Sequence, residues 1–329
     1  MLSRVAERMY WFGRLNERAE NTARLVSVNA NLLLDLPKMV KHIWADLINI
    51  TGGSEFFYKK FTRPDERNVV KFILADETNP ASLVCSVKAA RENARTTREI
   101  IPAEAWEKIN EFHLYVRKNV EKALKREGRH KFLNDVIMYC QQMTGLLFGN
   151  MSHGNAYNFI HIGMNLERAD MTTRIVDVGC MNLVQEQAEI PDSYDNILWM
   201  NVLRSLSAYQ MHRQNVLDRI TGKDVVEFLL KDPEFPRSVG HCMAELEWCF
   251  SKLPHNDLPL RSITHIYRII NDTDLNKLMV TNRLHSFIDE IQIDLGDIHN
   301  QVSQTWFGYT GEQQEQTGTV DAIAVSRPR

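Results

Sequence analysis

A helical period runs without interruption through the first 35 residues of the chain. Apolar side chains recur at alternating steps of three and four from Leu2 to Leu33, and Asn16 is the polar member of the series. Residues at this spacing share one face of an α-helix. Pro37 follows, where a helix is expected to stop. The pattern predicts one long helix over about residues 3–35.

The rest of the chain has the same period, and no window shows the sustained alternation that is typical of strands. Thr221 and Asp274 are expected to cap helices, as is Asn79 with Pro80 at the first helical position. Residues 51–66 are expected to form a connection, and Gly128 to end a helix. The expected fold is therefore an all-α, multi-helix bundle. Its further helices are predicted near 39–50, 66–76, 80–100, 102–127, 130–148, 154–183, 195–219, 223–231, 236–253, 257–271 and 274–306.

One segment of the chain is repeated. Gly13–Val28 aligns with Gly163–Val178 at a constant offset of 150, and eight of the sixteen positions are identical. The repeat predicts two related central helices in a single domain over residues 1–308, with halves of about 1–150 and 151–308. Residues 309–329 are rich in Gln, Thr and Gly and predict a disordered C-terminal tail.

Charged residues occupy the middle of both repeated segments. Glu17, Glu20 and Arg24 share a helix face beside the apolar stripe, and Glu167, Asp170 and Arg174 do the same in the second copy. Each helix also has apolar residues on its opposite face, so its central charges are expected to be partly buried. A buried charge needs a partner, because an isolated one costs several kcal/mol.

A line of arginines offers such partners. Arg91, Arg95 and Arg98 run beside the apolar stripe of the helix predicted over 80–100. A guanidinium binds carboxylates or phosphates through paired hydrogen bonds, and we expect these arginines to converge with the acidic residues. Two interpretations stay open: a structural ion-pair network, or a site for a ligand or partner. The candidate binding residues are Glu17, Arg18, Glu20, Arg24, Arg91, Arg95, Arg98, Glu167, Arg168, Asp170, Arg174 and Arg237.

Arg237 belongs to a second candidate site. Pro236 is expected to begin a helix, which would place Arg237 and Ser238 in its first turn. Free amides and the helix dipole favour an anion at such a position. The alternative is an ordinary helix cap with a solvated arginine.

Charge, apolar content and cysteine spacing argue against several classes of protein. A net charge of −3 and a pI near 6.4 disfavour a general nucleic-acid binder. No apolar run approaches the ~18 residues that cross a bilayer, and no signal-peptide core is present, so a cytoplasmic location is expected. The five cysteines are scattered and are expected to be reduced thiols rather than disulfide or zinc ligands.

No catalytic or cofactor-binding motif is present. The chain has no phosphate-binding glycine loop, nucleophile elbow or HExxH string, and we expect neither cofactor nor metal. One Glu-x-x-His string ends at His130, but a di-iron bundle needs a second copy on a facing helix.

Four segments resemble one known family. The run Tyr10–Arg24 is similar to the signature of the alpha-E domain family, which is named for its helices and its Glu-Arg motif. Leu166–Asp170, Arg91–Arg95 and Phe235–Val239 resemble its other marks, and together they span the chain to about residue 306. Arg14 has no counterpart in the second copy, which has Met164, so it carries less weight as a functional residue.

The resemblance implies a bacterial protein that is a partner of a circularly permuted ATP-grasp protein, with a transglutaminase-like protein as a second possible partner. ATP-grasp proteins join a carboxylate to an amine, so we expect a non-catalytic helical partner or accessory subunit of a peptide or amide ligase. It would bind the ligase, or an anionic peptide substrate, through the Glu/Arg cluster. Neither nucleic acid nor a membrane is expected as a partner.

The alternative is an enzyme in its own right that acts in peptide modification. Glu17 or Glu167 would then serve as the acid/base, and Arg91, Arg95 or Arg18 would hold an anionic substrate.

Overall fold

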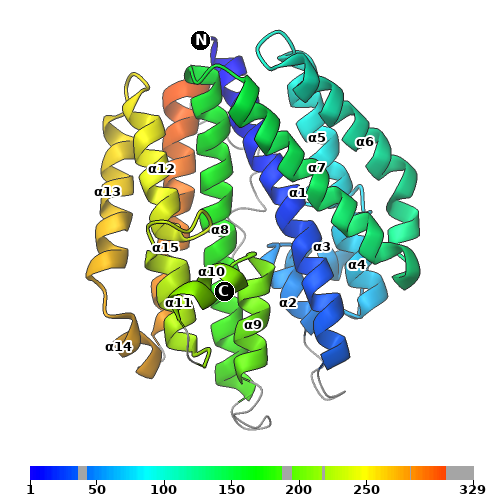
Figure 1. The fold of residues 1–329 in the computed structure, drawn as a ribbon, viewed down its shortest axis with the longest axis vertical. Coiled ribbons are helices and arrows are strands. Elements are labelled where there is room, and N and C mark those ends of the chain that lie inside the picture. The colour runs from blue at the N-terminus through cyan, green and yellow to red at the C-terminus, as the bar shows by residue number, and fades with distance from the viewer. Residues whose placement is uncertain (36–42, 187–194, 217–218, 282, 309–329) are drawn as a thin grey trace. The chain divides into compact units, whose positions relative to one another are not determined.

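The computed structural model describes residues 1–35, 43–186, 195–216, 219–281 and 283–308. Over these residues the chain forms only helices, so the predicted all-α class is confirmed (Figure 1). The helices are α1 Ser3–Asp35, α2 Ile43–Ile50, α3 Ser54–Lys60, α4 Glu66–Leu74, α5 Leu83–Thr96, α6 Ala103–Ala123, α7 Arg126–Asn150, α8 Asn155–Glu186, α9 Asp195–Ser205, α10 Tyr209–Asn215, α11 Gly222–Lys231, α12 Val239–Ser251, α13 Asp257–Asp272, α14 Leu275–Val280, α15 Leu284–Val302 and the π-helical turn η1 Ser303–Phe307.

The first predicted helix has the same bounds in the structure, whereas other boundaries differ. The expected connection over 51–66 contains α3, and Gly128 lies in the first turn of α7 instead of ending a helix. The helix expected over 195–219 is divided into α9 and α10, because Ser207 has a φ of 56°, which a right-handed helix does not allow. The stretch 274–306 is divided into α14, α15 and η1. Residues 39–42, 217–218 and the predicted tail over 309–329 lie outside the described residues.

Two of the expected caps are confirmed and one is wrong. Thr221 Oγ1 accepts a hydrogen bond from the amide of Asp224, and Asp274 accepts one from the amide of Lys277. Asn79 does not cap α5. Its side chain instead closes the preceding turn, because it donates to the Phe72 carbonyl at 3.1 Å and accepts from the Ala81 amide at 3.0 Å.

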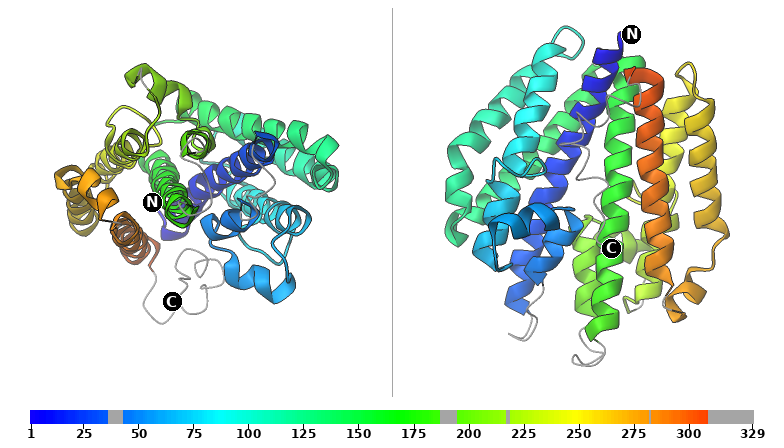
Figure 2. Two further views of the ribbon diagram at one scale, coloured as in Figure 1. Left: turned by 90° about the horizontal axis from the view of Figure 1, so that it is seen from below. Right: turned by 180° about the vertical axis from the view of Figure 1, so that it is seen from behind.

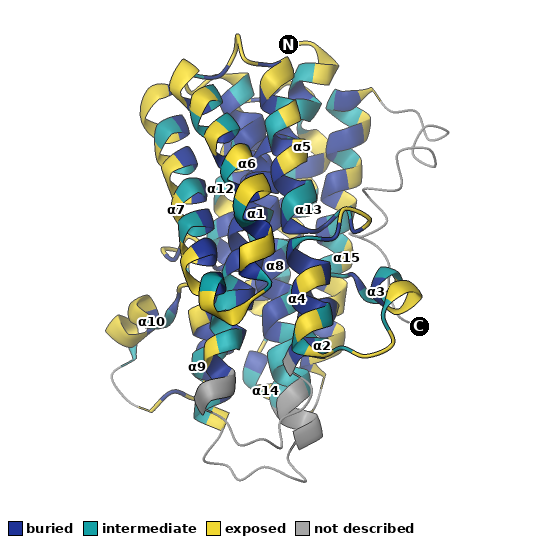
Figure 3. Ribbon diagram, turned by 90° about the vertical axis from the view of Figure 1, so that its right-hand side faces the viewer, coloured by how far each residue is buried: buried dark blue, intermediate teal, exposed yellow. Residues whose placement is uncertain are grey.

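The chain divides into two compact units. The first comprises Met1–Met164 together with the chain from Ser303 onward, and the second comprises Asn165–Val302. In the first unit α5 and α7 lie against α1, and α6 packs on both of them (Figure 1). In the second unit α13 packs on both α12 and α15, as the view from behind shows (Figure 2). Buried residues fill the middle of the long helices (Figure 3).

Two glycines of the repeat allow the backbones of α1 and α8 to touch within the first unit. A Cβ on Gly13 would overlap the carbonyl oxygen of Ile160, and a Cβ on Gly163 would overlap that of Tyr10. The two contacts are reciprocal at the offset of 150, since Gly163 corresponds to Gly13 and Ile160 to Tyr10. At both positions the close approach of a backbone carbonyl leaves room only for glycine.

A second repeated segment joins α4 to α5 and α11 to α12, and the sequence analysis missed it. Residues 69–82 and 225–238 share the pattern Val-Val-x-Phe-x-Leu-x-Asp-x-x-x-Pro-x-Ser at an offset of 156. The serine ends both segments as an N-cap: Ser82 accepts from the amide of Cys85, and Ser238 accepts from the amide of His241. The change of offset from 150 to 156 hides this segment from a search that continues the first repeat without a gap.

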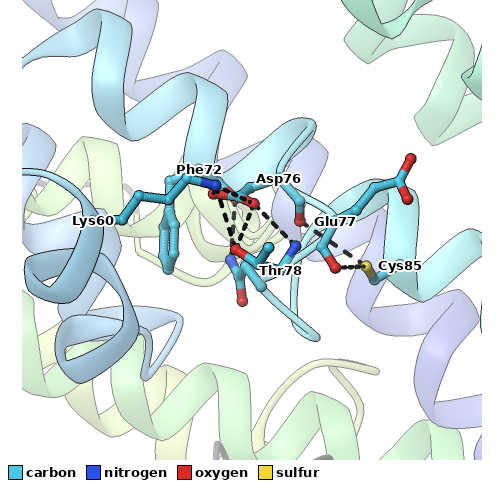
Figure 4. Close-up of polar contacts among 7 residues, drawn as sticks. Lys60, Phe72, Asp76, Glu77, Thr78 and Cys85 are labelled. Atoms are coloured by element: carbon cyan, nitrogen blue, oxygen red, sulfur yellow. Dashed lines mark hydrogen bonds and ion pairs between the residues drawn. The ribbon is translucent and has the colours of Figure 1, made fainter.

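The aspartate of this pattern organises the turn in both units. Asp76 is buried and accepts hydrogen bonds from Lys60 Nζ at 2.7 Å and from the amide and hydroxyl of Thr78 (Figure 4). Burial opposes ionisation of Asp76, but the hydrogen bonds from Lys60 and Thr78 outweigh it and hold the pKa of this carboxyl below its usual value. Asp232 accepts from the amides of Glu234 and Phe235. The shared aspartate therefore fixes how the chain enters α5 and α12.

Replacing the second glycine with alanine tests the backbone contact. Gly163→Ala is expected to lower the free energy of unfolding by about 1–3 kcal/mol, because the new methyl group meets a backbone carbonyl that cannot turn aside. Gly145→Ala is the matched control, since nothing lies within 4 Å of a Cβ at this position in α7. It is expected to raise stability by about 0.5–1 kcal/mol. Urea denaturation measures the free energy of unfolding of both variants. Equal stability of the two variants would contradict the close backbone contact at Gly163.

Candidate functional site

The polar face of α1 is buried, as the sequence predicts. Glu17 has 0% of its surface exposed and Glu20 has 3%. The guanidinium of Arg24 holds Glu20 Oε1 with two nitrogens, Nε at 3.0 Å and Nη2 at 2.7 Å. Arg18 is half-buried. One acidic residue of this face is thus neutralised by an arginine one turn further along the same helix.

The second copy places its charges in the same way. Glu167 on α8 is 1% exposed, and Arg174 Nε donates to Asp170 Oδ1 at 2.9 Å. Arg168 is half-buried, like Arg18. The i,i+4 acid–arginine pair is therefore made once on α1 and once on α8. In each case the carboxylate and the guanidinium satisfy each other within one helix, which is the geometry of a structural ion pair.

Arg14 is held by aromatic side chains. It is buried, donates to the Tyr10 hydroxyl at 3.2 Å and lies over the ring of Trp11 with its guanidinium carbon 5.5 Å from the ring centre. Such cation–π contacts stabilise a charge that has left water. These contacts give Arg14 a structural role, in agreement with the low functional weight that the sequence gives it.

The arginine line on α5 does not join the buried acids as predicted. Arg95 and Arg98 are exposed, and Arg95 pairs with Glu92 on its own helix at 2.6 Å. Arg91 donates to Asn110 Oδ1 of α6 at 2.7 Å and lies over the Trp106 ring. The helix buries only a narrow stripe of small and branched residues, and the positions beside that stripe turn outward. The prediction of convergence is wrong for Arg95 and Arg98, and Arg91 contacts Asn110 and Trp106 of α6.

A different set of cationic side chains lies on α5 and α6. We call Lys88, Arg91 and Arg117, whose charges act on His113 of α6, the basic face. Burial lowers the pKa of His113, and the charges of Arg91, Arg117 and Lys88 lower it further. Lys88 and Arg117 are exposed to solvent. The sequence analysis missed this surface because its members come from two helices and share no motif.

Arg237 lies before α12 and not in its first turn, because Ser238 is the N-cap. The Arg237 residue is 8% exposed, and its carbonyl accepts a hydrogen bond from the Thr172 hydroxyl of α8 at 2.7 Å. The predicted placement of Arg237 and Ser238 in the first turn is therefore wrong. The alternative is right in expecting a helix cap, which Ser238 provides, and wrong in expecting a solvated arginine. The residue instead ties the start of α12 to the second repeated helix.

Two of the thiols are poor nucleophiles. All five cysteines are free, as predicted. Burial raises the pKa of Cys180 and of Cys249 to about 12, so both thiols are protonated at neutral pH. Glu127 and His130, the one Glu-x-x-His string, are exposed at the start of α7. None of the described helices is both long and apolar enough to span a membrane.

A family model for a predicted alpha-helical domain with a conserved ER motif, named Alpha-E, matches residues 1–307. The chain therefore belongs to the Alpha-E family. It is 24% identical over 277 residues to an uncharacterized protein of Mycobacterium bovis, and 23% identical to one of Mycobacterium tuberculosis. In both cases the match covers 76% of this chain but only 30% of the relative. No solved structure matches the chain.

Removing one member of a partly buried ion pair tests its structural role. Glu20→Gln is expected to lower the free energy of unfolding by about 1–3 kcal/mol, because Arg24 loses a charged partner at a site largely removed from water. Glu55→Gln is the control, since the Lys59–Glu55 pair has the same i,i+4 spacing but is open to solvent, and its loss is expected to leave stability unchanged. Thermal unfolding measures the stability of both variants. A large loss of stability for Glu55→Gln alone would refute the structural role of the Glu20–Arg24 pair.

Proposed function

We propose that this chain is a non-catalytic helical partner of an ATP-grasp peptide or amide ligase, and that it holds an anionic segment of the ligase or of its peptide substrate on the basic face. The observation that carries the proposal is the grouping of Lys88, Arg91 and Arg117 around His113. All the charges that shift the pKa of this histidine are cationic. A group of cationic side chains attracts an anionic segment and speeds its association with the protein.

The binding role moves from the helix middles to this surface for a physical reason. Glu20–Arg24 and Asp170–Arg174 are satisfied ion pairs. Burial at such positions makes partner exchange costly, because each charge would have to lose its counter-charge before it met a ligand. The basic face has exposed cations at no such cost.

The comparisons support an accessory role. The region that matches this chain makes up 30% of the mycobacterial relatives, so in those proteins it belongs to a much longer polypeptide. A helical domain without a catalytic motif that accompanies other domains fits a docking or substrate-holding task. The ligase as partner rests on the family resemblance alone and is an analogy.

The enzyme alternative has less support. A general acid or base must come within hydrogen-bond reach of the substrate. Glu17 and Glu167 are 0% and 1% exposed, so in this conformation neither reaches a dissolved substrate.

Charge reversal on the basic face tests the proposal. The full chain is mixed with a circularly permuted ATP-grasp protein from the same organism, and complex formation is followed by co-purification and by titration at low and high salt. The variant Lys88→Glu with Arg117→Glu is expected to weaken binding at least tenfold, since both exposed cations become anions. Lys71→Glu with Lys223→Glu makes the same charge change at exposed positions on α4 and α11, and is expected to bind like the wild type. Salt is expected to weaken the wild-type complex.

The possible outcomes distinguish a wrong binding surface from a wrong function. Absence of any complex, with ligase activity unchanged by this protein, refutes the proposed function. A complex that the Lys88→Glu, Arg117→Glu variant retains at full strength refutes the basic face as its site.

The pKa of His113 gives an independent measurement. In the free protein this pKa is lowered, so the unfolded chain binds a proton more readily and His113 costs stability as pH falls below its ordinary value of 6.5. An acidic peptide bound on the basic face is expected to raise the pKa of His113, as is the Lys88→Glu, Arg117→Glu substitution without peptide. NMR titration of the imidazole, assigned with His113→Asn, measures the shift. A pKa that neither change moves would contradict the proximity of the three cations.

A further inference from the structure

A histidine and two aspartates meet on α8 and α15 in the second unit, outside the basic face. His285 Nδ1 lies 2.7 Å from Asp177 Oδ1, and His285 Nε2 lies 3.6 Å from Asp289 Oδ2. One ligating atom from each residue lies within 4.8 Å of the others, and among the described residues this is the one such group of three. His285 and Asp289 are exposed, whereas Asp177 is largely covered.

Asp177 fixes the ring of His285. A carboxylate only accepts hydrogen bonds, so in the neutral imidazole the proton lies on Nδ1 and donates to Asp177. This assignment leaves the lone pair on Nε2, which is the nitrogen next to Asp289. A carboxylate that holds the far nitrogen of a metal-bound histidine is the usual second shell of such a ligand.

The distance between Nε2 and Asp289 suits two ligands of one ion. At 3.6 Å it is longer than an N–H···O hydrogen bond, which spans about 2.7–3.2 Å. Ligands about 2.1 Å from a tetrahedral zinc ion are about 3.4 Å apart. The i,i+4 spacing of His285 and Asp289 on α15 keeps both groups on one helix face, and solvent can supply the remaining ligands.

We propose that His285 Nε2 and Asp289 bind one divalent transition-metal ion of the zinc class, with Asp177 as the carboxylate that orients the histidine. An imidazole nitrogen beside a carboxylate favours zinc over magnesium, which prefers oxygen ligands. Asp177 occupies a repeated position where the first copy has Ser27, so the group is a feature of the second copy only. The inference does not depend on the proposed function.

The sequence predicts no metal site, because these three residues form no motif of closely spaced ligands along the chain. Asp177 and His285 are 108 residues apart, and only the packing of α15 against α8 joins them. A lone His-x-x-x-Asp on a helix is too common to signal a site.

Zinc titration of the full chain tests the proposal. The protein is stripped with a chelator and titrated with zinc chloride by calorimetry, and cobalt is used to record a ligand-field spectrum. The wild type is expected to bind one zinc ion per chain, with magnesium giving no heat. His285→Ala and Asp289→Asn are each expected to weaken binding at least tenfold. Asp177→Asn is expected to weaken it about 10–100-fold, which is typical of a lost second-shell carboxylate.

Two controls remove other sources of binding. His265→Ala removes an exposed histidine of α13 in the same unit, and Cys180→Ser removes the thiol one turn from Asp177. Both are expected to bind zinc like the wild type. His285 and Asp289 are exposed, so their variants are expected to fold, which circular dichroism checks. A wild type without zinc binding below millimolar concentration overturns the proposal. So does a His285→Ala variant that binds as tightly, or variants that change only the melting temperature.

Discussion

The cost of taking carboxylates out of water governs the two long helices of this protein. Glu17, Glu20 and Glu167 lie in helix middles where almost no surface is left to solvent. A charge in such a place stays ionised only beside a counter-charge or several donors. The arginine four residues after Glu20, and the one four residues after Asp170, meet this demand from within the same helix. These two ion pairs are therefore part of the packed interior of α1 and α8.

The sequence predicts those features that depend on neighbours along the chain. The period of three and four gives α1 its observed bounds, and the caps at Thr221 and Asp274 follow from side-chain chemistry within three residues. Burial of Glu17 and Glu167 follows from apolar residues on two opposed faces of one helix. The break at Ser207 could not be predicted, because a positive φ at a serine has no signature in the local sequence. The start of α5 was misplaced because Asn79 and Ser82 are both favourable N-cap residues.

The features that the sequence does not predict depend on which helix faces which. Arg95 and Arg98 have the spacing of a buried line, but α5 buries a narrower stripe than its pattern suggests, and they turn to solvent. Arg117 belongs to α6, so the sequence of α5 does not predict that Arg91 and Arg117 both act on His113. The contact of Asp177 with His285 likewise depends on tertiary packing. Contacts between residues of different helices can be identified only from the three-dimensional structure.

The reciprocal glycine contact also bears on how the two copies depend on each other. The boundary between the compact units lies within α8, after Met164, and not at the join between the repeats near residue 150. Gly13 of the first copy lies against Ile160 of the second, so the first compact unit includes the opening turns of the second copy's helix. A chain cut at residue 150 would expose the surface of α1 that the first turns of α8 cover. The two repeated segments therefore cannot be separated at the join between them, because α1 and the start of α8 belong to one compact unit.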